Sequence, residues 1–361
     1  MIRKSARTAA RLHSSVGKRG PAASGRDASV VEMDLEERES LVCHLFCQGK
    51  TVPEITEALK DRVTLTREQP YAILRLAAKR GRLRYSPPVE PELALSIMEQ
   101  YRLQKVRVVG SAEPADIADA TARLLTGMVR DWRGEDLHIG FAGGGLLHET
   151  VRRMAEELRK PGPAPRRIYF HALIAAAHDP SRAPNAFLHW FLDTQFSFET
   201  HFVGLPAPGL VSASTLKKLK RIEGIKEAFD RAKEISIVVT SAGDHWNRGC
   251  SSLYKLFKEK ASAEAMKELQ KCDVVGDIMW QPVSRQGPVR IESGLRAVTL
   301  MDLPDLVPMV RRGGQVVLAL APCGACGDPK AGILRTALSW PDRVFTHLVA
   351  DTRTASGLFT T

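Results

Sequence analysis

Residues 137–153, LHIGFAGGGLLHETVRR, contain the pattern that decides the fold. The apolar run LHIGFA leads through Gly143, Gly144 and Gly145 into a segment whose apolar residues recur at helical spacing. Such a turn lets backbone amides approach an anion at the helix N-terminus, and it equally suits close packing of a strand and a helix. We keep both interpretations open for these three glycines and for Gly140 within the run.

The same alternation continues on both sides of this unit. Further strand-like runs are KVRVVG (105–110), RIYFHALIAA (167–176), SFETHFVGL (197–205), EISIVVTSAG (234–243), VVGDIMWQPV (274–283), QVVLALAP (315–322) and VFTHLVAD (344–351). Helical patterns lie at about 91–101, 114–132, 146–158, 185–196, 214–233, 303–311 and 330–338. Strands alternating with helices predict an α/β domain over residues 95–361, with a parallel sheet covered on both faces.

A different organisation precedes residue 89. Two helical patterns, 35–48 and 51–59, are followed by a Thr66/Gln69 capping box that opens a third helix ending near Arg80. A short strand-like stretch, 82–85, completes the elements of a winged helix-turn-helix at 31–88. Proline residues 87, 88 and 91 mark a linker at about 89–94.

The third helix carries the candidate DNA-binding residues. If Ile73, Leu76 and Ala77 face the core, the 3.6-residue period turns the polar positions outward or to the rim. Those positions, together with one arginine on the wing, are Arg67, Gln69, Tyr71, Arg75, Lys79 and Arg82. Arginine and glutamine can reach base edges or phosphates in the major groove. The alternative is a solvated basic helix end that offsets the helix dipole.

The net charge of +11 is concentrated in two places. Residues 1–30 carry a net +6 and residues 66–84 a net +5, so the rest of the chain sums to zero. Two local basic segments favour an anionic partner such as double-stranded DNA. Residues 1–30 lack apolar periodicity and are predicted to be a disordered basic tail, with an organelle transit peptide as the alternative.

Other classes of protein are excluded or disfavoured by composition. No apolar run approaches the ~18 residues of a membrane span, and six scattered cysteines in a 361-residue chain do not indicate a secreted disulfide framework. We therefore expect a cytoplasmic protein. The histidines show no paired metal-ligand spacing, and we expect neither a metal nor a cofactor. Cys323 and Cys326 form C-G-A-C, which could be a redox pair or half of a zinc site, but a tight turn of small residues is the preferred interpretation.

Two charged residues are candidates for binding a small molecule. Asp277 follows a glycine at a strand end, and Lys330 begins a helix after the loop GDP. Loops 140–146, 241–245 and 323–330 all follow predicted strands, and such loops meet at one crevice in an open parallel sheet. An Asp–Lys pair is also a common structural ion pair. Asp351 and Thr354 are predicted to cap the final helix.

Seven stretches, taken in order and spacing, resemble a known family. They are LFCQGKTVPEITEAL (45–59), TREQPYAILRLAAKRGRLRY (66–85), GLPAPGLV (204–211), ISIVVTSAG (235–243), VVGDIMWQPVSRQGPV (274–289), GDPKAGILRTAL (327–338) and THLVADTRTASGLF (346–359). Together they resemble the SorC/DeoR-type sugar-binding transcriptional regulators. The resemblance is strong over 95–361 and more divergent in the helix-turn-helix, where Pro70 and Tyr71 replace the usual β-branched or small residues.

The resemblance implies a Rossmann-like effector domain, of the fold shared with ribose-5-phosphate isomerase and glucosamine-6-phosphate deaminase. It further implies a homo-oligomeric regulator whose DNA affinity changes when a sugar or sugar phosphate binds near Gly140, Gly143, Gly144, Gly145, Asp277 and Lys330. Leu146 stands where the family commonly has a hydroxyl residue, which favours a neutral or singly anionic ligand. The alternatives are an isomerase- or deaminase-like enzyme using Asp277 and Lys330, and a regulator whose effector site is degenerate.

Overall fold

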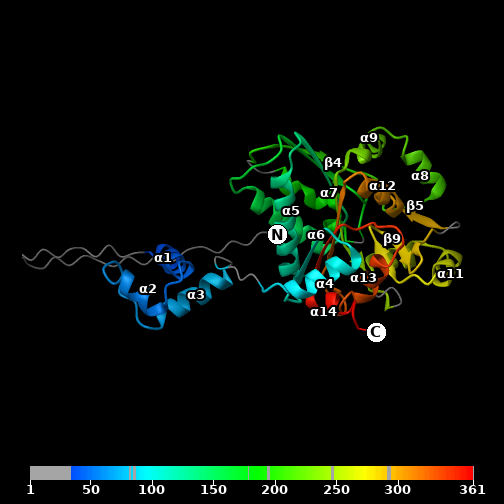
Figure 1. Ribbon diagram of the computed structural model, residues 1–361. Helices are drawn as coiled ribbons and strands as arrows, with labels where there is room; N and C mark the ends of the chain where they lie inside the picture. The colour runs from blue at the N-terminus through cyan, green and yellow to red at the C-terminus, as the bar shows by residue number, and fades with distance from the viewer. Residues whose placement is uncertain are drawn as a thin grey trace, which may run out of the picture. The chain divides into compact units, whose positions relative to one another are not determined.

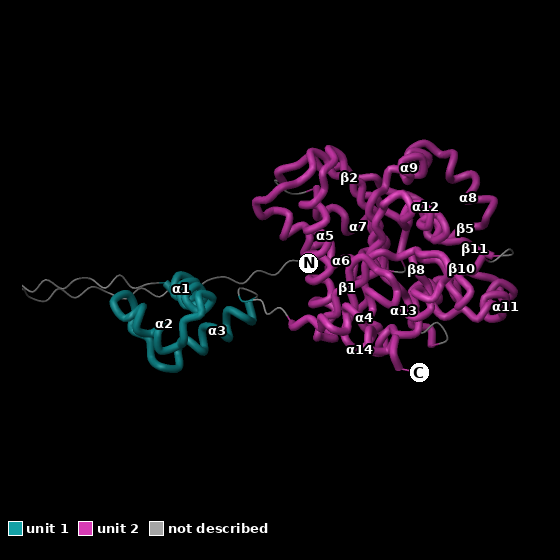
Figure 2. The backbone as a smooth tube through the Cα atoms, in the orientation of Figure 1, with its two compact units in different colours: residues 1–85 teal, residues 86–361 magenta. Residues whose placement is uncertain are grey.

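The chain divides into two compact units, residues 1–85 and 86–361 (Figure 2). The computed structural model describes residues 34–80, 83, 87–177, 179–192, 196–244, 248–290 and 294–360. The predicted basic tail and most of the predicted wing, including Arg82, lie outside these ranges.

The first unit consists of three helices around a small apolar core. They are α1 (Leu35–Cys47), α2 (Val52–Leu59) and α3 (Gln69–Lys79). The Asp34 carboxylate accepts from the Glu37 N–H at 2.7 Å and caps α1, while the Thr51 N–H donates to the Glu54 carboxylate at 2.7 Å at the start of α2. The core is formed by Val42, Ile55, Leu59, Val63 and Leu65.

The second unit is built on a seven-stranded sheet whose order is β1-β13-β12-β6-β2-β3-β4. Every neighbouring pair is parallel, as the sequence predicted. The strands are β1 (Lys105–Val109), β2 (Asp136–Phe141), β3 (Arg167–Ala172), β4 (Glu199–Val203), β6 (Ile237–Thr240), β12 (Gln315–Leu320) and β13 (His347–Asp351). All residues of β6 and β13 are buried, which requires cover on both faces of the sheet.

Helices join and cover these strands (Figure 1). They are α4 (Pro91–Tyr101), α5 (Pro114–Asp131), α6 (Gly145–Leu158), α7 (Pro184–Phe187), α8 (Ala213–Leu219), α9 (Ile225–Arg231), α10 (Ser252–Lys260), α11 (Ala263–Lys271), α12 (Leu306–Arg311), α13 (Ala331–Leu338) and α14 (Thr352–Ser356). Among the described residues no helix is long and apolar enough to cross a membrane.

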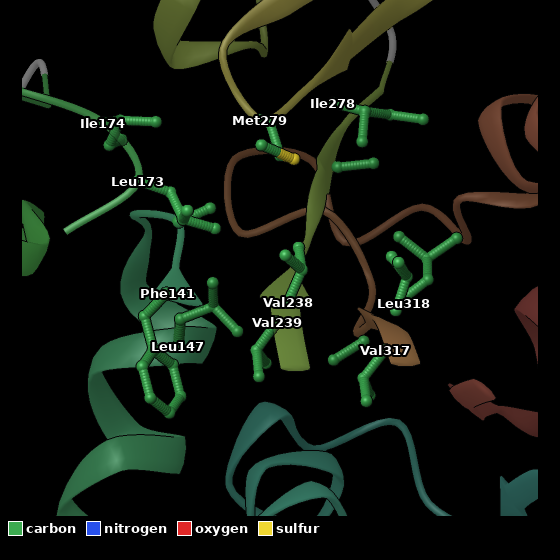
Figure 3. Packing of buried hydrophobic residues seen from close by; sticks show 14 of the residues in the cluster. Phe141, Leu147, Leu173, Ile174, Val238, Val239, Ile278, Met279, Val317 and Leu318 are labelled. Atoms are coloured by element: carbon green, nitrogen blue, oxygen red, sulfur yellow. The ribbon is translucent and has the colours of Figure 1, made fainter. Parts of the chain in front are cut away.

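The core lies where the central strands meet the first turn of α6. Figure 3 shows Val238 and Val239 of β6 between Phe141 of β2 and Val317 of β12. All four side chains are fully buried. Fully burying a side chain of this kind contributes ~1.5–3 kcal/mol, so these contacts stabilise the central strands.

Two predicted helices are interrupted. The 185–196 pattern is a short α7 followed by a 3-10 turn, Leu188–Phe191, because the Phe191 ring stacks on Phe170 with centroids 3.8 Å apart. The 214–233 pattern divides into α8 and α9 at Gly224, whose φ of +81° is incompatible with a continuous helix.

The run 274–283 is a hairpin and contributes no strand to the parallel sheet. β8 (Gly276–Ile278) and β9 (Gln281–Ser284) pair antiparallel within a small sheet that also contains β7 (Ala242–Gly243) and β10 (Gly287–Pro288). Met279 and Trp280 form the turn with φ of +51° and +61°. Two-residue hairpin turns of this type normally contain Asn or Gly, so the apolar pair gave no turn signal. A second small sheet pairs β5 (Leu210–Ser212) with β11 (Leu295–Ala297).

The expected linker is partly structured against the second unit. The Glu90 N–H donates to the Val108 carbonyl at 2.9 Å, and the Gly110 N–H donates to the Pro88 carbonyl at 2.7 Å. Helix α4 then begins at Pro91. Residues 88–90 therefore run along the outer edge of β1, which would otherwise be an unpaired strand edge.

Candidate functional sites

A cavity of about 470 Å³ lies at the carboxyl ends of three adjacent strands, β2, β6 and β12. Parallel strands bring the loops after their carboxyl ends to one edge, and this edge is the usual ligand crevice of open α/β sheets. The lining includes Ala142–Leu146 after β2, Ser241–Asp244 after β6 and Ala321–Ala325 after β12. Arg182, Cys250–Ser252, Lys255, Asp277, Met279, Trp280 and Lys330 also line it.

Asp277 and Lys330 both line this cavity; Asp277 is buried and Lys330 is half-buried. Asp277, in the middle of β8, accepts a short hydrogen bond from the Ser251 hydroxyl. Burial raises the pKa of Asp277 to about 6, against the lowering effects of the Ser251 hydroxyl and of Lys330. The carboxyl therefore takes up or loses a proton close to neutral pH.

Lys330 is the N-cap residue of α13 and is held from two directions. Its backbone N–H donates to the Thr354 hydroxyl at 3.1 Å, and its Nζ donates to the carbonyl oxygen of Ala242 at 2.7 Å. Burial lowers the pKa of Lys330, against the attraction of Cys323, Asp277 and other acidic groups. The ammonium group is thus held at the cavity wall with further donor capacity for a ligand.

The three glycines of the turn line the cavity, whereas Gly140 does not. Gly143, Gly144 and Gly145 all line it, and α6 begins at Gly145. Gly144 has a φ of +122°, and a Cβ on Gly143 would lie 2.6 Å from the Ile174 side chain. Gly140 lies within β2, where a Cβ would lie 2.6 Å from Leu173, and it is not among the lining residues.

Four cavity residues carry chemistry that the sequence patterns did not mark: Arg182, Asp244, Ser251 and Lys255. Arg182 follows β3, the strand beside β2, so the convergence of loops after parallel strands could have indicated it. Ser251 caps α10 and Lys255 lies one turn further on, in a helix that the periodicity did not reveal. Met279 and Trp280 also line the cavity. The backbone of both residues adopts the left-handed conformation, which is rare for residues other than glycine.

Three thiols lie close together, and two of them, those of Cys250 and Cys323, belong to residues that line the cavity. The Sγ atoms of Cys250, Cys323 and Cys326 lie within 4.8 Å of one another, and none of the three is in a disulfide. Cys323 is buried and Cys326 is exposed. Burial raises the pKa of the Cys250 thiol to about 11. For Cys323 burial is outweighed by the N–H groups of Cys326 and Ala325, and the pKa lies below its usual value.

The candidate DNA-contact residues of α3 that the structure describes are all exposed. Arg67, Gln69, Tyr71, Arg75 and Lys79 face solvent, while Ala77 is buried and Ile73 and Leu76 are half-buried, which is the division that the helical period predicted. Tyr71 and Arg75 border a shallow hollow with Leu74 and Ala78.

Arg80 is engaged elsewhere. Its Nη1 lies 2.6 Å from the Glu39 carboxylate, which is only 1% exposed. This contact ties α3 to α1 and takes one arginine out of the basic surface.

The histidines nearest one another lie outside the cavity. His138 Nδ1 and His171 Nε2 are 2.9 Å apart, one on β2 and one on β3. Burial lowers the pKa of His171 to about 3 and also lowers the pKa of His138, so both rings are neutral at physiological pH and one can donate its N–H to the other. Within the described residues the only cluster of three possible metal ligands is the group of thiols.

A comparison with protein families gives one match, to the family described as "Putative sugar-binding domain", over residues 90–360. This range is three quarters of the chain and contains every described residue of the cavity. The chain belongs to this sugar-binding-domain family. A search of curated proteins by sequence returns no match.

Solved structures with the same fold include members whose described role is in transcription. The full-length sorbitol operon regulator SorC of Klebsiella pneumoniae is 15% identical, with 91% of this chain and 100% of that chain covered and a TM-score of 0.65. A DeoR family transcriptional regulator of Listeria monocytogenes is 20% identical, covering 74% and 98%, with a TM-score of 0.54. A transcriptional regulator of Streptococcus pneumoniae is 18% identical, covering 74% and 95%, with a TM-score of 0.56.

These likenesses show the fold alone. The sugar-binding-domain family accounts for the parallel-sheet unit, and the coverage of 91% against a full-length regulator includes residues before the match begins at 90. The predicted Rossmann-like parallel-sheet unit is confirmed, and the three helices predicted for the winged helix-turn-helix are present, while most of its wing lies outside the described residues.

Proposed function

We propose that this chain is a DNA-binding transcriptional regulator whose affinity for its operator is controlled by a small sugar-like effector. The observation that carries the proposal is the cavity of a sugar-binding-domain family member, placed on the same chain as a helix with exposed basic residues. In this proposal the effector lies against the Gly143–Gly145 turn. Asp277 accepts hydrogen bonds from its hydroxyl groups, and Lys330 donates to an oxygen or an anionic group.

DNA binding is assigned to α3. Arg75 and Lys79 on α3 and Arg67 just before it are exposed cations, and no described acidic side chain forms an ion pair with them. A helix with this charge can enter the major groove, with Gln69 and Arg75 near base edges and the lysine near phosphates. We propose a cytoplasmic homo-oligomer, because paired helices reading repeated half-sites allow an effector to change their spacing.

Control by the effector follows from linkage between the two binding events. A ligand that binds one arrangement of the second units more tightly shifts the population toward it, and DNA affinity changes by the same factor that DNA exerts on the ligand. The operator is accordingly palindromic or tandem.

The test begins with thermal-shift measurements on the full chain in the presence of sugars, sugar acids and sugar phosphates. A ligand that raises the melting temperature of the wild type should have a much smaller effect on Lys330→Ala and Asp277→Ala. Lys267→Ala, an exposed lysine of α11, is the matched control and should respond as the wild type does. Equal stabilisation of all four proteins would place the ligand outside this cavity.

The second arm measures DNA binding. Duplexes enriched from a random pool by the full chain are titrated by fluorescence anisotropy with and without the stabilising ligand. The proposal requires an enriched sequence and a change of at least about fivefold in affinity, the usual lower limit of allosteric coupling. Failure to enrich any duplex would contradict it.

Asp277 and Lys330, two ionisable groups that line the same cavity, give a specific reason to test for enzymatic activity as well. Asp277 with a pKa of about 6 could act as an acid or a base in sugar-phosphate isomerisation. Incubation of the stabilising sugar phosphate with the protein, followed by product analysis, separates the two functions. A regulator returns its ligand unchanged, whereas turnover that Asp277→Asn abolishes would favour the enzyme.

A further inference from the structure

Three cysteines from two distant parts of the chain meet beside the cavity. Cys250 directly precedes Ser251, the N-cap residue of α10, and Cys323 and Cys326 lie in the loop between β12 and α13. We propose that their three thiolates bind one zinc ion per chain, with the fourth coordination position directed into the cavity. A C-x-x-C loop supplies only half of a zinc site, and the fold supplies the third thiol from 73 residues earlier in the chain.

The distances suit a small thiophilic cation. Three sulfurs at the 4.8 Å limit lie about 2.8 Å from their common centre, and zinc–thiolate bonds are about 2.3 Å long. In a tetrahedral site each sulfur therefore has to move inward by at most about 0.6 Å, which side-chain rotation can provide. Hard cations such as Mg²⁺ and Ca²⁺ prefer oxygen ligands, so the sulfur set favours zinc over both of these ions.

The loop holds two of the ligands in place before any ion arrives. The Cys323 N–H donates to the Asp328 carbonyl at 2.8 Å, and the Gly327 N–H donates to the Cys323 carbonyl at 2.7 Å. Gly327 has a φ of +74°, which a glycine adopts without strain. The turn of small residues expected from the sequence is therefore present, and it is compatible with ligand binding.

The metal ion can reach the proposed site from solvent, and one coordination position faces the cavity. Cys326 is exposed at the surface, so an ion can enter from solvent, whereas Cys323 is buried. Cys250 and Cys323 both line the cavity that also contains Lys330 and Asp277. A site with three protein ligands keeps a fourth position for water or for a ligand oxygen, as open zinc sites do. Here that oxygen would come from the cavity.

The charge of the filled site is compatible with its surroundings. Three thiolates and one Zn²⁺ leave a single negative charge, and Cys323 is the acidic group whose attraction most opposes the lowering of the Lys330 pKa. A charge beside an opposite charge is far less costly to bury than an isolated one. Zinc binding thus converts three thiols, with loss of their protons, into one singly charged group that the nearby lysine stabilises.

The experiment uses the full chain, reduced with a phosphine and freed of metal with a chelator, and it involves neither DNA nor sugar. Zn²⁺ alone is titrated in competition with a chromogenic chelator, and proton release is measured in weak buffer because thiols lose protons when they bind metal. We expect one Zn²⁺ per chain. Substitution by Co²⁺ should give the intense near-ultraviolet charge-transfer absorption of cobalt–thiolate bonds.

Three variants make the test specific. Cys250→Ser and Cys326→Ser should each weaken zinc binding by at least about 100-fold, since even the loss of a group that only supports a ligand costs 10–100-fold. Cys272→Ser, the C-cap residue of α11 and outside the cluster, should bind as the wild type does. The melting curve of each metal-free variant shows whether it is folded. Because Cys326 is exposed, Cys326→Ser decides the test if Cys250→Ser does not fold.

Either of two results would overturn the proposal. The first is less than one zinc ion per chain in the reduced wild type; if that protein also forms a Cys323–Cys326 disulfide in air, the two cysteines are a redox pair instead. The second is wild-type zinc affinity in Cys250→Ser, which would show that the third thiol is not a ligand. Neither result would bear on the proposed regulation of DNA binding by a sugar-like molecule.

Discussion

At the scale of single residues, the cavity contains a carboxyl group whose burial opposes folding. The pKa of Asp277 is about 6 in the folded chain and near 3.8 when exposed, so the folded state binds the proton more tightly. Stability contributed by this group falls as pH rises from about 4 to about 6 and is constant above that window. Ionised Asp277 therefore costs stability at neutral pH, which a ligand that hydrogen-bonds the carboxylate can recover.

We predict that Asp277→Asn stabilises the ligand-free chain at pH 7.5 by roughly 1–3 kcal/mol, because the amide removes the buried charge and still accepts from Ser251. The gain should shrink to about a third of that value at pH 4.5. Denaturant unfolding at the two pH values measures it. Asp273→Asn, which replaces an exposed aspartate just before β8, is the matched control for the loss of a carboxyl group. A gain that is the same at both pH values would mean that the carboxyl is not strained by burial.

Arg75 is the residue through which specificity for a DNA sequence can be examined. It lies in the middle of α3 with its side chain exposed. If its guanidinium reads a base, Arg75→Ala should cost ~1–3 kcal/mol on the enriched duplex and much less on unrelated duplexes. Arg62→Ala, an exposed arginine between α2 and α3, is the matched control for general charge loss. Equal losses on every duplex would make Arg75 a phosphate contact.

At the scale of elements, local patterns predicted the structure well where side chains alone decide it. The strand, glycine turn and helix at 137–153 were predicted to within one or two residues. The apolar strand run, the glycines and the helical spacing of apolar residues all occur in one continuous stretch of sequence. The hairpin at 274–283 was not predicted. Its turn consists of Met279 and Trp280, which are not residues typical of turns, and both side chains are buried. Cys250 could not be grouped with Cys323 because only the fold brings the two segments together.

We propose that the first turn of α6 influences which anions the cavity can hold. Gly145 and Leu146 of this turn line the cavity, and a hydroxyl group at position 146 would add a hydrogen-bond donor for a phosphate. We predict that Leu146→Ser increases the thermal shift produced by sugar phosphates and leaves that of the corresponding free sugars nearly unchanged. Leu146→Ala separates the added hydroxyl from the removed bulk. If the alanine and serine variants respond alike, the hydroxyl is not used.

At the scale of the whole molecule, the placement of charge predicts how binding to DNA responds to salt. The net charge of +11 lies in residues 1–30 and 66–84, and one of those cations, Arg80, is already paired with Glu39. A protein that neutralises Z phosphates shows a slope of about −0.9Z in log K against log[salt]. Five or more contacts from the first unit and the residues before it would therefore give a slope steeper than about −4.

Two truncations separate the contributions to that slope. Removing residues 1–30 should make the slope shallower and weaken binding to all duplexes alike, while the preference for the enriched duplex remains, because an unpatterned basic segment contacts phosphates and carries no base readout. Removing residues 1–85 leaves the second unit, which has its own core, and should abolish DNA binding while ligand-induced thermal stabilisation persists. Anisotropy titrations between 50 and about 300 mM salt measure the slopes. A slope unchanged by either truncation would place the DNA surface on the second unit and contradict the assignment of DNA binding to α3.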